Sequence, residues 1–111
     1  MLRARERRVI PAPVLVELDY WCDVKRLTRA FDDVLRQIPT EAVFIEPLIA
    51  DDYARVVELR DRYRDLRVGF VDAAVLSVVE RLGERRLATL DRRHFSVMRP
   101  RHVAALELLP A

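Results

Sequence analysis

The chain has 111 residues, of which 51% are hydrophobic and 34% are charged. This is enough for one globular domain and leaves no room for a second core. Twenty basic and eighteen acidic residues give a net charge of +2, which excludes a polybasic tail but permits binding to RNA or DNA. The single cysteine, Cys22, excludes an intrachain disulfide. We therefore expect one domain over residues 1–111 in the cytoplasm, with neither a signal peptide nor a membrane span.

The first half of the chain predicts a short extended run, two helices and a buried strand. The extended run covers residues 8–12, and Pro13 suits the first turn of a helix that reaches about Cys22. In the following segment, apolar residues recur at helical spacing until Pro39 ends the pattern. The stretch AVFIEP, residues 42–47, has the length and the β-branched composition of a buried strand.

The second half predicts two more helices and two more strands. The stretch DDYARVVELRDRYRD is amphipathic, with two aspartates at its positive N-terminal end. FVDAAVLSVVERLG is apolar nearly all round, so we expect a buried helix ended by Gly83. RRLATLD is a short strand, and the tail after RRHF predicts one more strand with irregular chain. Strands that alternate with helices indicate a parallel sheet covered on both faces, an α/β fold.

Three carboxylates interrupt apolar or strand-like segments, and each has a purely structural interpretation. Glu17 lies near the first turn of its helix, where the helix dipole favours an anion. Asp72 could serve the same end-of-helix role or pair with a buried arginine. Asp91 could form an Asx turn after its strand.

Together, the three carboxylates fit a single site. Glu17 follows the strand at 8–10, Asp72 begins a helix, and Asp91 follows the strand at 86–89. In parallel α/β sheets, ligands bind outside the carboxyl ends of the strands. Converging carboxylates repel one another unless a cation lies between them, and their hard oxygen atoms suit Mg²⁺ or Mn²⁺. The pattern therefore predicts a metal site, and such a site supports phosphodiester hydrolysis.

Several other residues could also contribute to catalysis or metal binding. Thr89 lies two residues before Asp91, so both side chains face the same way in an extended chain. It could orient a water or a carboxylate, although threonine is also a common strand residue. His94 and His102 are too few and too badly spaced for a zinc site. No nucleophile-and-base signature is present, which argues against covalent catalysis.

Three ordered blocks of the sequence, VIPAPVLVELDYW, LRVGFVDAAVLSVVERLG and RLATLDRRHFSVMRP, resemble the PIN-domain ribonuclease toxins of the VapC type. The resemblance covers almost the whole chain. It implies a PIN-like three-layer α/β/α fold and the toxin component of a type II toxin–antitoxin system. It also implies a Mg²⁺-dependent endoribonuclease that cleaves structured RNA such as tRNA or rRNA, a homodimer, and a cognate VapB-type antitoxin. Glu17, Asp72 and Asp91 fall on three of the family's four acidic positions, and Thr89 falls on its accessory hydroxyl position.

The fourth acidic position has no counterpart here. In the family it ends an apolar first strand, whereas this chain begins MLRARERR. Asp19 does not substitute, because two helical positions place it about 200° around the axis from Glu17. We therefore expect an N-terminally truncated PIN-like domain in which the strands at 8–10 and 86–89 lack their shared neighbour.

Three functional interpretations follow from this departure. The chain is an active nuclease that works with three acidic residues or borrows a fourth from a partner. Alternatively, it is a catalytically inactive remnant that only binds antitoxin or dimerises, with the helix at 26–38 as a natural surface for such contacts. The third interpretation is a structural α/β domain whose acidic residues only stabilise helix ends.

Overall fold

The computed structural model describes residues 8–89 and 92–109, and the chain divides into two compact units between Pro47 and Leu48. Each unit contains one parallel pair of strands together with its own helices. The first unit carries Glu17 and the second carries Asp72.

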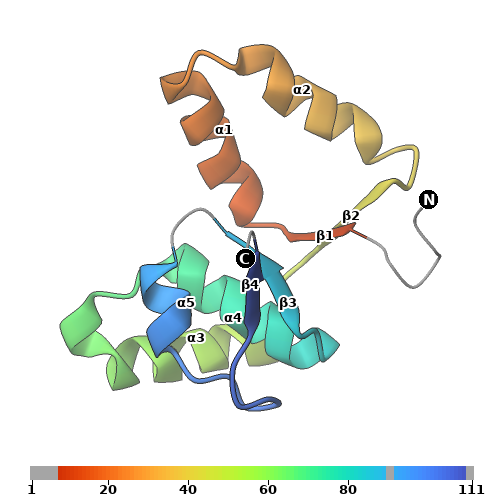
Figure 1. Ribbon diagram of the computed structural model, residues 1–111. Helices are drawn as coiled ribbons and strands as arrows, with labels where there is room; N and C mark the ends of the chain where they lie inside the picture. The colour runs from red at the N-terminus through yellow and green to blue at the C-terminus, as the bar shows by residue number, and fades with distance from the viewer. Residues whose placement is uncertain (1–7, 90–91, 110–111) are drawn as a thin grey trace. The chain divides into compact units, whose positions relative to one another are not determined.

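The first unit has two helices inserted between two parallel strands (Figure 1). Parallel strands need a long crossover connection, and here the two helices provide it. The first helix begins directly after Pro13, as the sequence predicted. Ile10 lies opposite Ile45 in the strand pair. The elements are β1 (Arg8–Pro11), α1 (Val14–Val24), α2 (Thr28–Gln37) and β2 (Val43–Glu46).

Few side chains of the first unit are buried. Among its described residues, Val43 of β2 is the one fully buried apolar residue, and neither α1 nor α2 buries a side chain completely. Large apolar side chains on or beside these helices remain exposed: Val16, Tyr20, Trp21, Val24, Leu27 and Leu35. Exposed apolar patches often mark interaction sites in proteins.

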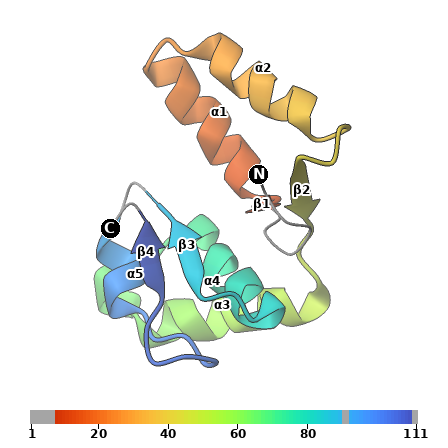
Figure 2. The same cartoon turned by 45° about the vertical axis from the view of Figure 1, so that its right-hand side comes forward.

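The second unit packs two long helices against each other and adds a second parallel strand pair. Both views show α3 and α4 side by side (Figures 1 and 2). Leu87 lies opposite Leu108 in the strand pair. The elements are α3 (Ala50–Arg62), a 3₁₀ turn (Arg64–Leu66), α4 (Phe70–Leu82), β3 (Arg86–Ala88), α5 (Arg93–Val97) and β4 (Glu107–Leu109).

The core of the second unit forms around α4. Every residue from 73 to 79 is buried, which confirms the prediction of a helix that is apolar nearly all round. Leu59 of α3 and Leu76 of α4 have no exposed surface, and burial of each leucine contributes on the order of 2 kcal/mol. Gly83 ends the helix with a left-handed backbone (φ 68°), as predicted. The position of Asp72 therefore depends on a well-anchored helix.

The predicted fold class is confirmed, because helices alternate with strands and both strand pairs are parallel. Among the described residues, β1 pairs with β2 and β3 pairs with β4, so β1 and β3 share no neighbouring strand. The prediction was incomplete at α5, which forms where only connecting chain was expected. Within residues 8–89 and 92–109, no helix has the length and apolar character required to cross a bilayer.

Candidate functional site

Asp72 lies in the first turn of α4, which begins after Gly69. The positive end of the helix dipole favours a carboxylate at this position. The Asp72 side chain keeps 23% of its surface exposed, so solvent or a ligand can reach its oxygen atoms. A fully buried carboxylate would need a fixed counter-charge, but the Asp72 carboxylate is partly exposed to solvent.

His94 of α5 lies against the Asp72 carboxylate. The distance from His94 Nδ1 to Asp72 Oδ2 is 2.7 Å, and the histidine side chain is 21% exposed. An ionised carboxylate only accepts hydrogen bonds, so His94 donates its Nδ1–H. Asp72 lies in the first turn of its helix, as predicted, and its described partner is a histidine rather than the arginine that the sequence suggested.

Thr89 comes directly after β3. Its backbone N–H donates to the carbonyl oxygen of Leu109 at 3.0 Å, which continues the pairing of β3 with β4 by one residue. The residue is half-buried. Asp91 lies outside the described residues, so its predicted role beside Thr89 stays a prediction.

Glu17 lies in the first turn of α1, as expected, and is exposed. It belongs to the first unit, whereas Asp72 belongs to the second. Within the described part of the chain, no three His, Cys, Asp or Glu side chains form a group that would hold a metal ion. The convergence of Glu17, Asp72 and Asp91 on one cation therefore stays a prediction. By type, their hard carboxylate oxygens fit Mg²⁺ or Mn²⁺.

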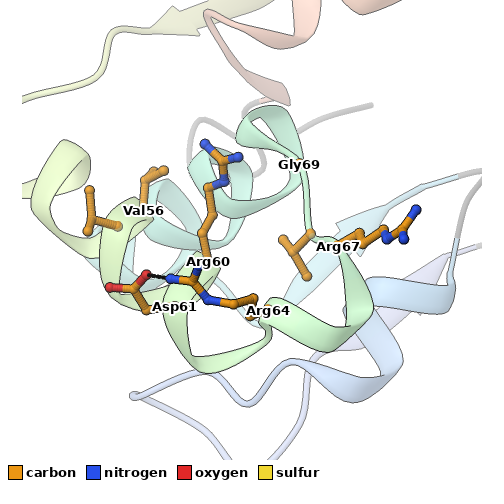
Figure 3. Close-up of a pocket in the computed structure, with 8 residues that line it drawn as sticks. Val56, Arg60, Asp61, Arg64, Arg67 and Gly69 are labelled. Atoms are coloured by element: carbon orange, nitrogen blue, oxygen red, sulfur yellow. Dashed lines mark hydrogen bonds and ion pairs between the residues drawn. The ribbon is translucent and has the colours of Figure 1, made fainter.

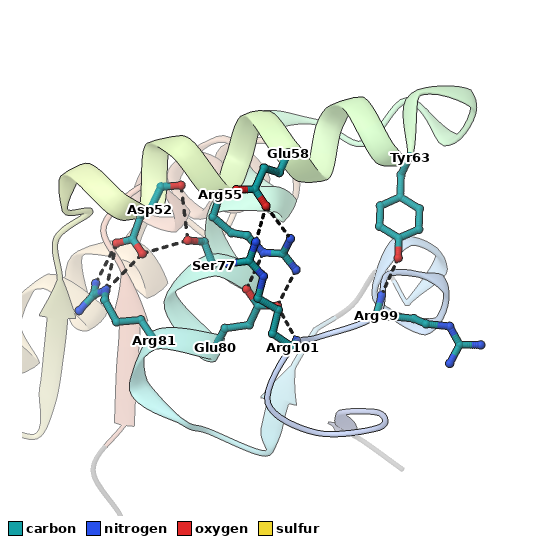
Figure 4. A network of polar contacts seen from close by, with 9 residues as sticks. All are labelled: Asp52, Arg55, Glu58, Tyr63, Ser77, Glu80, Arg81, Arg99 and Arg101. Carbon is teal, nitrogen blue, oxygen red and sulfur yellow. Dashed lines mark hydrogen bonds and ion pairs between the residues drawn. The ribbon is translucent and has the colours of Figure 1, made fainter.

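A second acidic cluster joins α3 to α4 (Figure 4). Asp52 of α3 is only 2% exposed. Its Oδ1 accepts from Ser77 Oγ at 2.9 Å and its Oδ2 accepts from Arg81 Nη2 at 3.0 Å. The Ile49 N–H donates to Oδ2 at 2.9 Å and so caps α3. Burial alone would raise the pKa of Asp52, but the hydrogen bonds from Arg81, Ile49 and Ser77, with the Arg81 charge, together lower it below 3.8.

Glu80 and Glu58 complete this cluster, and both are bound by arginines. Arg55 donates to Glu80 Oε1 from Nε at 2.8 Å and to Oε2 from Nη2 at 2.9 Å. Arg101 donates from its backbone N–H to Glu80 and from its guanidinium to Glu58. Hydrogen bonding to Glu80 raises the pKa of Arg55. Since arginines compensate these carboxylates, the cluster holds the helices together and does not resemble a cation site.

Comparison with known proteins identifies the family. The sequence profile described as "PIN domain" matches residues 1–99. The chain belongs to the PIN-domain family. A curated relative, "Ribonuclease VapC26" of Mycobacterium tuberculosis (strain ATCC 25618 / H37Rv), is 34% identical over 92 residues. That alignment covers 83% of this chain and 68% of the relative. The PIN domain is therefore of the VapC type, as the three sequence blocks indicated.

Sequence reasoning missed the contact of His94 with Asp72. The histidine was considered only as a zinc ligand or as a partner for a nucleophile, and neither pattern fitted. Its contact with Asp72 joins residues 22 positions apart, on helices whose packing no local spacing reveals. The available signal was its place in the block RLATLDRRHF, which begins at the strand that precedes Asp91.

Proposed function

We propose that this PIN domain is the ribonuclease toxin of a type II toxin–antitoxin system, a Mg²⁺- or Mn²⁺-dependent endoribonuclease that cleaves structured RNA such as tRNA or rRNA. The observation that carries the proposal is Asp72, an accessible carboxylate fixed by α4 and by His94. Its support is the 34% identity to a protein named as a ribonuclease. The whole chain, residues 1–111, is proposed to form one PIN-like domain.

In this proposal, Glu17, Asp72 and Asp91 hold the divalent cation. A bound cation polarises a phosphoryl oxygen and lowers the pKa of a bound water. His94 holds Asp72 Oδ2, and we propose that Oδ1 is the oxygen that would bind the cation. Thr89 is proposed to orient a water or a neighbouring carboxylate from the end of β3. The hydrogen bond from His94 thus holds Asp72 in place before the substrate arrives, which avoids reorganisation of this carboxylate during the reaction.

The proposed partners are a cognate VapB-type antitoxin and a second copy of this chain. The first unit supports this part of the proposal, because α1 and α2 expose large apolar side chains. On the predicted helix at 26–38, Leu27 and Leu35 are 56% and 39% exposed. Burial of such side chains would contribute roughly 25 cal/mol per Å² of apolar surface. A complex in which a partner covers them would therefore be stabilised.

The experiment that tests the proposed activity is cleavage of total tRNA and of rRNA by the purified 111-residue chain. We expect endonucleolytic fragments with Mg²⁺ or Mn²⁺ and none with EDTA, because EDTA removes the cation that Glu17, Asp72 and Asp91 would hold, and that cation would activate a water and neutralise phosphoryl charge. A folded chain that leaves both RNAs intact with either metal would favour the inactive remnant that only binds antitoxin or dimerises.

His94 is expected to act as a positioning residue for Asp72. Hydrogen-bonded partners of metal-binding carboxylates contribute about 10- to 100-fold to metal affinity. His94→Phe removes the donor and keeps an aromatic ring, so Mn²⁺ affinity should fall by about that factor. His94→Asn, which can place an amide N–H near the position of Nδ1, should restore much of it. Titration of Mn²⁺ by electron paramagnetic resonance measures both, and wild-type affinity in His94→Phe would contradict the assignment.

A further inference from the structure

A hollow of about 440 Å³ lies in the second unit, where α3 ends and the 3₁₀ turn begins. Two buried valines, Val56 and Val68, each 4% exposed, contribute apolar surface to it. Arginine is the commonest charged residue in the lining (Figure 3). The lining residues are Val56, Val57, Arg60, Asp61, Arg64, Arg67, Val68 and Gly69.

The arginines of the hollow differ in how they are compensated. Arg64 donates to Asp61 at 2.7 Å, three residues back along the chain. Figure 3 shows the Arg60 and Arg67 side chains directed away from this pair. Within the described residues, neither Arg60 nor Arg67 forms an ion pair with an aspartate or a glutamate. Three arginines against one aspartate leave the lining with a surplus of two positive charges.

The backbone places this charge close to the proposed catalytic carboxylate. Arg67 has a left-handed backbone (φ 52°) and turns the chain after the 3₁₀ turn, a conformation that costs a non-glycine residue about 1 kcal/mol. The hollow ends at Gly69, which is the N-cap of α4. Asp72 lies in the first turn of that same helix. A ligand held by the arginines would therefore lie near the end of α4 that carries Asp72.

We infer that the hollow binds the phosphate backbone of the RNA strand. The inference rests on the proposed ribonuclease function. Guanidinium groups bind phosphate through two parallel hydrogen bonds and keep their charge at any physiological pH. A volume of about 440 Å³ lies within the range of small-ligand sites and admits a nucleotide. RNA is favoured over an acidic protein segment because the hollow adjoins the helix end that carries the candidate catalytic residue.

The most direct test is a substitution that should increase the affinity for RNA. Asp61→Asn removes the acid that compensates Arg64, so Arg64 becomes available to one more phosphate. The logarithm of the binding constant falls linearly with the logarithm of the salt concentration, and one added phosphate contact makes this slope steeper by about 0.7 for single-stranded RNA. At 0.1 M salt this corresponds to about fivefold tighter binding. Fluorescence anisotropy of a labelled single-stranded RNA, measured in EDTA, reports affinity in the absence of cleavage.

The chain offers a matched control for this substitution. Asp33 and Arg36 of α2 form a pair with the same spacing and the same 2.7 Å distance, and their side chains are 67% and 71% exposed. The corresponding exposures of Asp61 and Arg64 are 62% and 79%. Asp33→Asn therefore makes the same change of charge in a similar surface pair that does not line the hollow. It should leave RNA affinity near the wild-type value.

The complementary test is a loss of affinity. Arg60→Gln with Arg67→Gln should weaken RNA binding about 25-fold at 0.1 M salt and flatten the salt dependence by about 1.4, because two phosphate contacts are removed. Arg85→Gln with Arg86→Gln removes the same charge at the start of β3 and should have a much smaller effect. All four arginines are exposed, so the variants should fold, and circular dichroism checks this.

Several results would overturn the inference. The first is that Asp61→Asn binds RNA no better than Asp33→Asn does. The second is that the Arg60 and Arg67 double variant binds RNA as tightly as the wild type. The third is that the wild-type chain does not bind RNA at all. If instead an oligoglutamate peptide loses affinity in the double variant while RNA does not, the hollow is a protein-binding site. Because binding is measured in EDTA, a chain that binds RNA through the hollow yet never cleaves it would contradict only the proposed activity.

Discussion

Asp72→Asn is expected to abolish metal-dependent cleavage of tRNA. The substitution replaces an ionised carboxylate by a neutral amide of nearly the same shape on the first turn of α4. Loss of a metal ligand forfeits several kcal/mol of charge stabilisation in the transition state, and about 4 kcal/mol corresponds to a thousandfold lower rate. Single-turnover cleavage with Mg²⁺ or Mn²⁺, compared with the wild-type chain, measures this effect.

Asp51→Asn is the matched control for this prediction. Asp51 also lies in the first turn of a helix, α3, and is exposed. Its loss costs at most about 1 kcal/mol of helix stabilisation and should leave the cleavage rate unchanged. Equal activity of the two variants would show that Asp72 only stabilises a helix end, as the structural interpretation of the sequence held.

RNA affinity in EDTA separates chemistry from binding. Asp72→Asn should bind labelled RNA at least as well as the wild type, because removing a negative charge near a phosphate backbone reduces repulsion. The arginine variants of the hollow should show the opposite pattern, with weaker binding. A fall in both affinity and rate for Asp72→Asn would instead indicate that the variant is misfolded, and circular dichroism would reveal it.

The helices were the most predictable part of the fold. The extent of α4 followed from its unbroken apolar run and from Gly83, because glycine readily adopts the left-handed backbone that ends a helix. The parallel pairing followed from alternating strands and helices. The helix α5 was missed because its five residues are too few to show a periodic pattern.

The candidate site was predictable only in part. Asp72 was found because a carboxylate within an apolar run is costly to bury without a reason. Its contact with His94 depends on how α5 packs, which no local pattern encodes. Asp52 was expected only to favour the start of α3, whereas it also binds Arg81, 29 residues away. Glu17 lies in the first turn of α1, as expected.

Asp52→Ala is expected to destabilise the second unit by about 3 kcal/mol at neutral pH. The substitution removes the carboxylate that accepts from the Ile49 N–H and leaves the buried Ser77 hydroxyl with only its 3.4 Å contact to the Asp52 carbonyl oxygen. It also leaves Arg81 without this carboxylate. Breaking a buried pair costs about 3–5 kcal/mol. The lower end applies here because the Arg81 side chain is 24% exposed and keeps contact with water. Urea unfolding followed by circular dichroism measures the loss, with Asp51→Ala as the exposed neighbouring control.

The pH dependence of the same variant tests the cause of this destabilisation. Because the pKa of Asp52 is lowered on folding from 3.8, the folded state favours the ionised carboxylate, and the resulting stabilisation is complete only above that pH. It is lost as the pH falls through the lower pKa of the folded state. The gap in unfolding free energy between wild type and Asp52→Ala should therefore narrow as the solution is acidified below about pH 4. If the difference in unfolding free energy instead stays constant down to pH 2, the destabilisation comes from lost packing and not from the lost ion pair between Asp52 and Arg81.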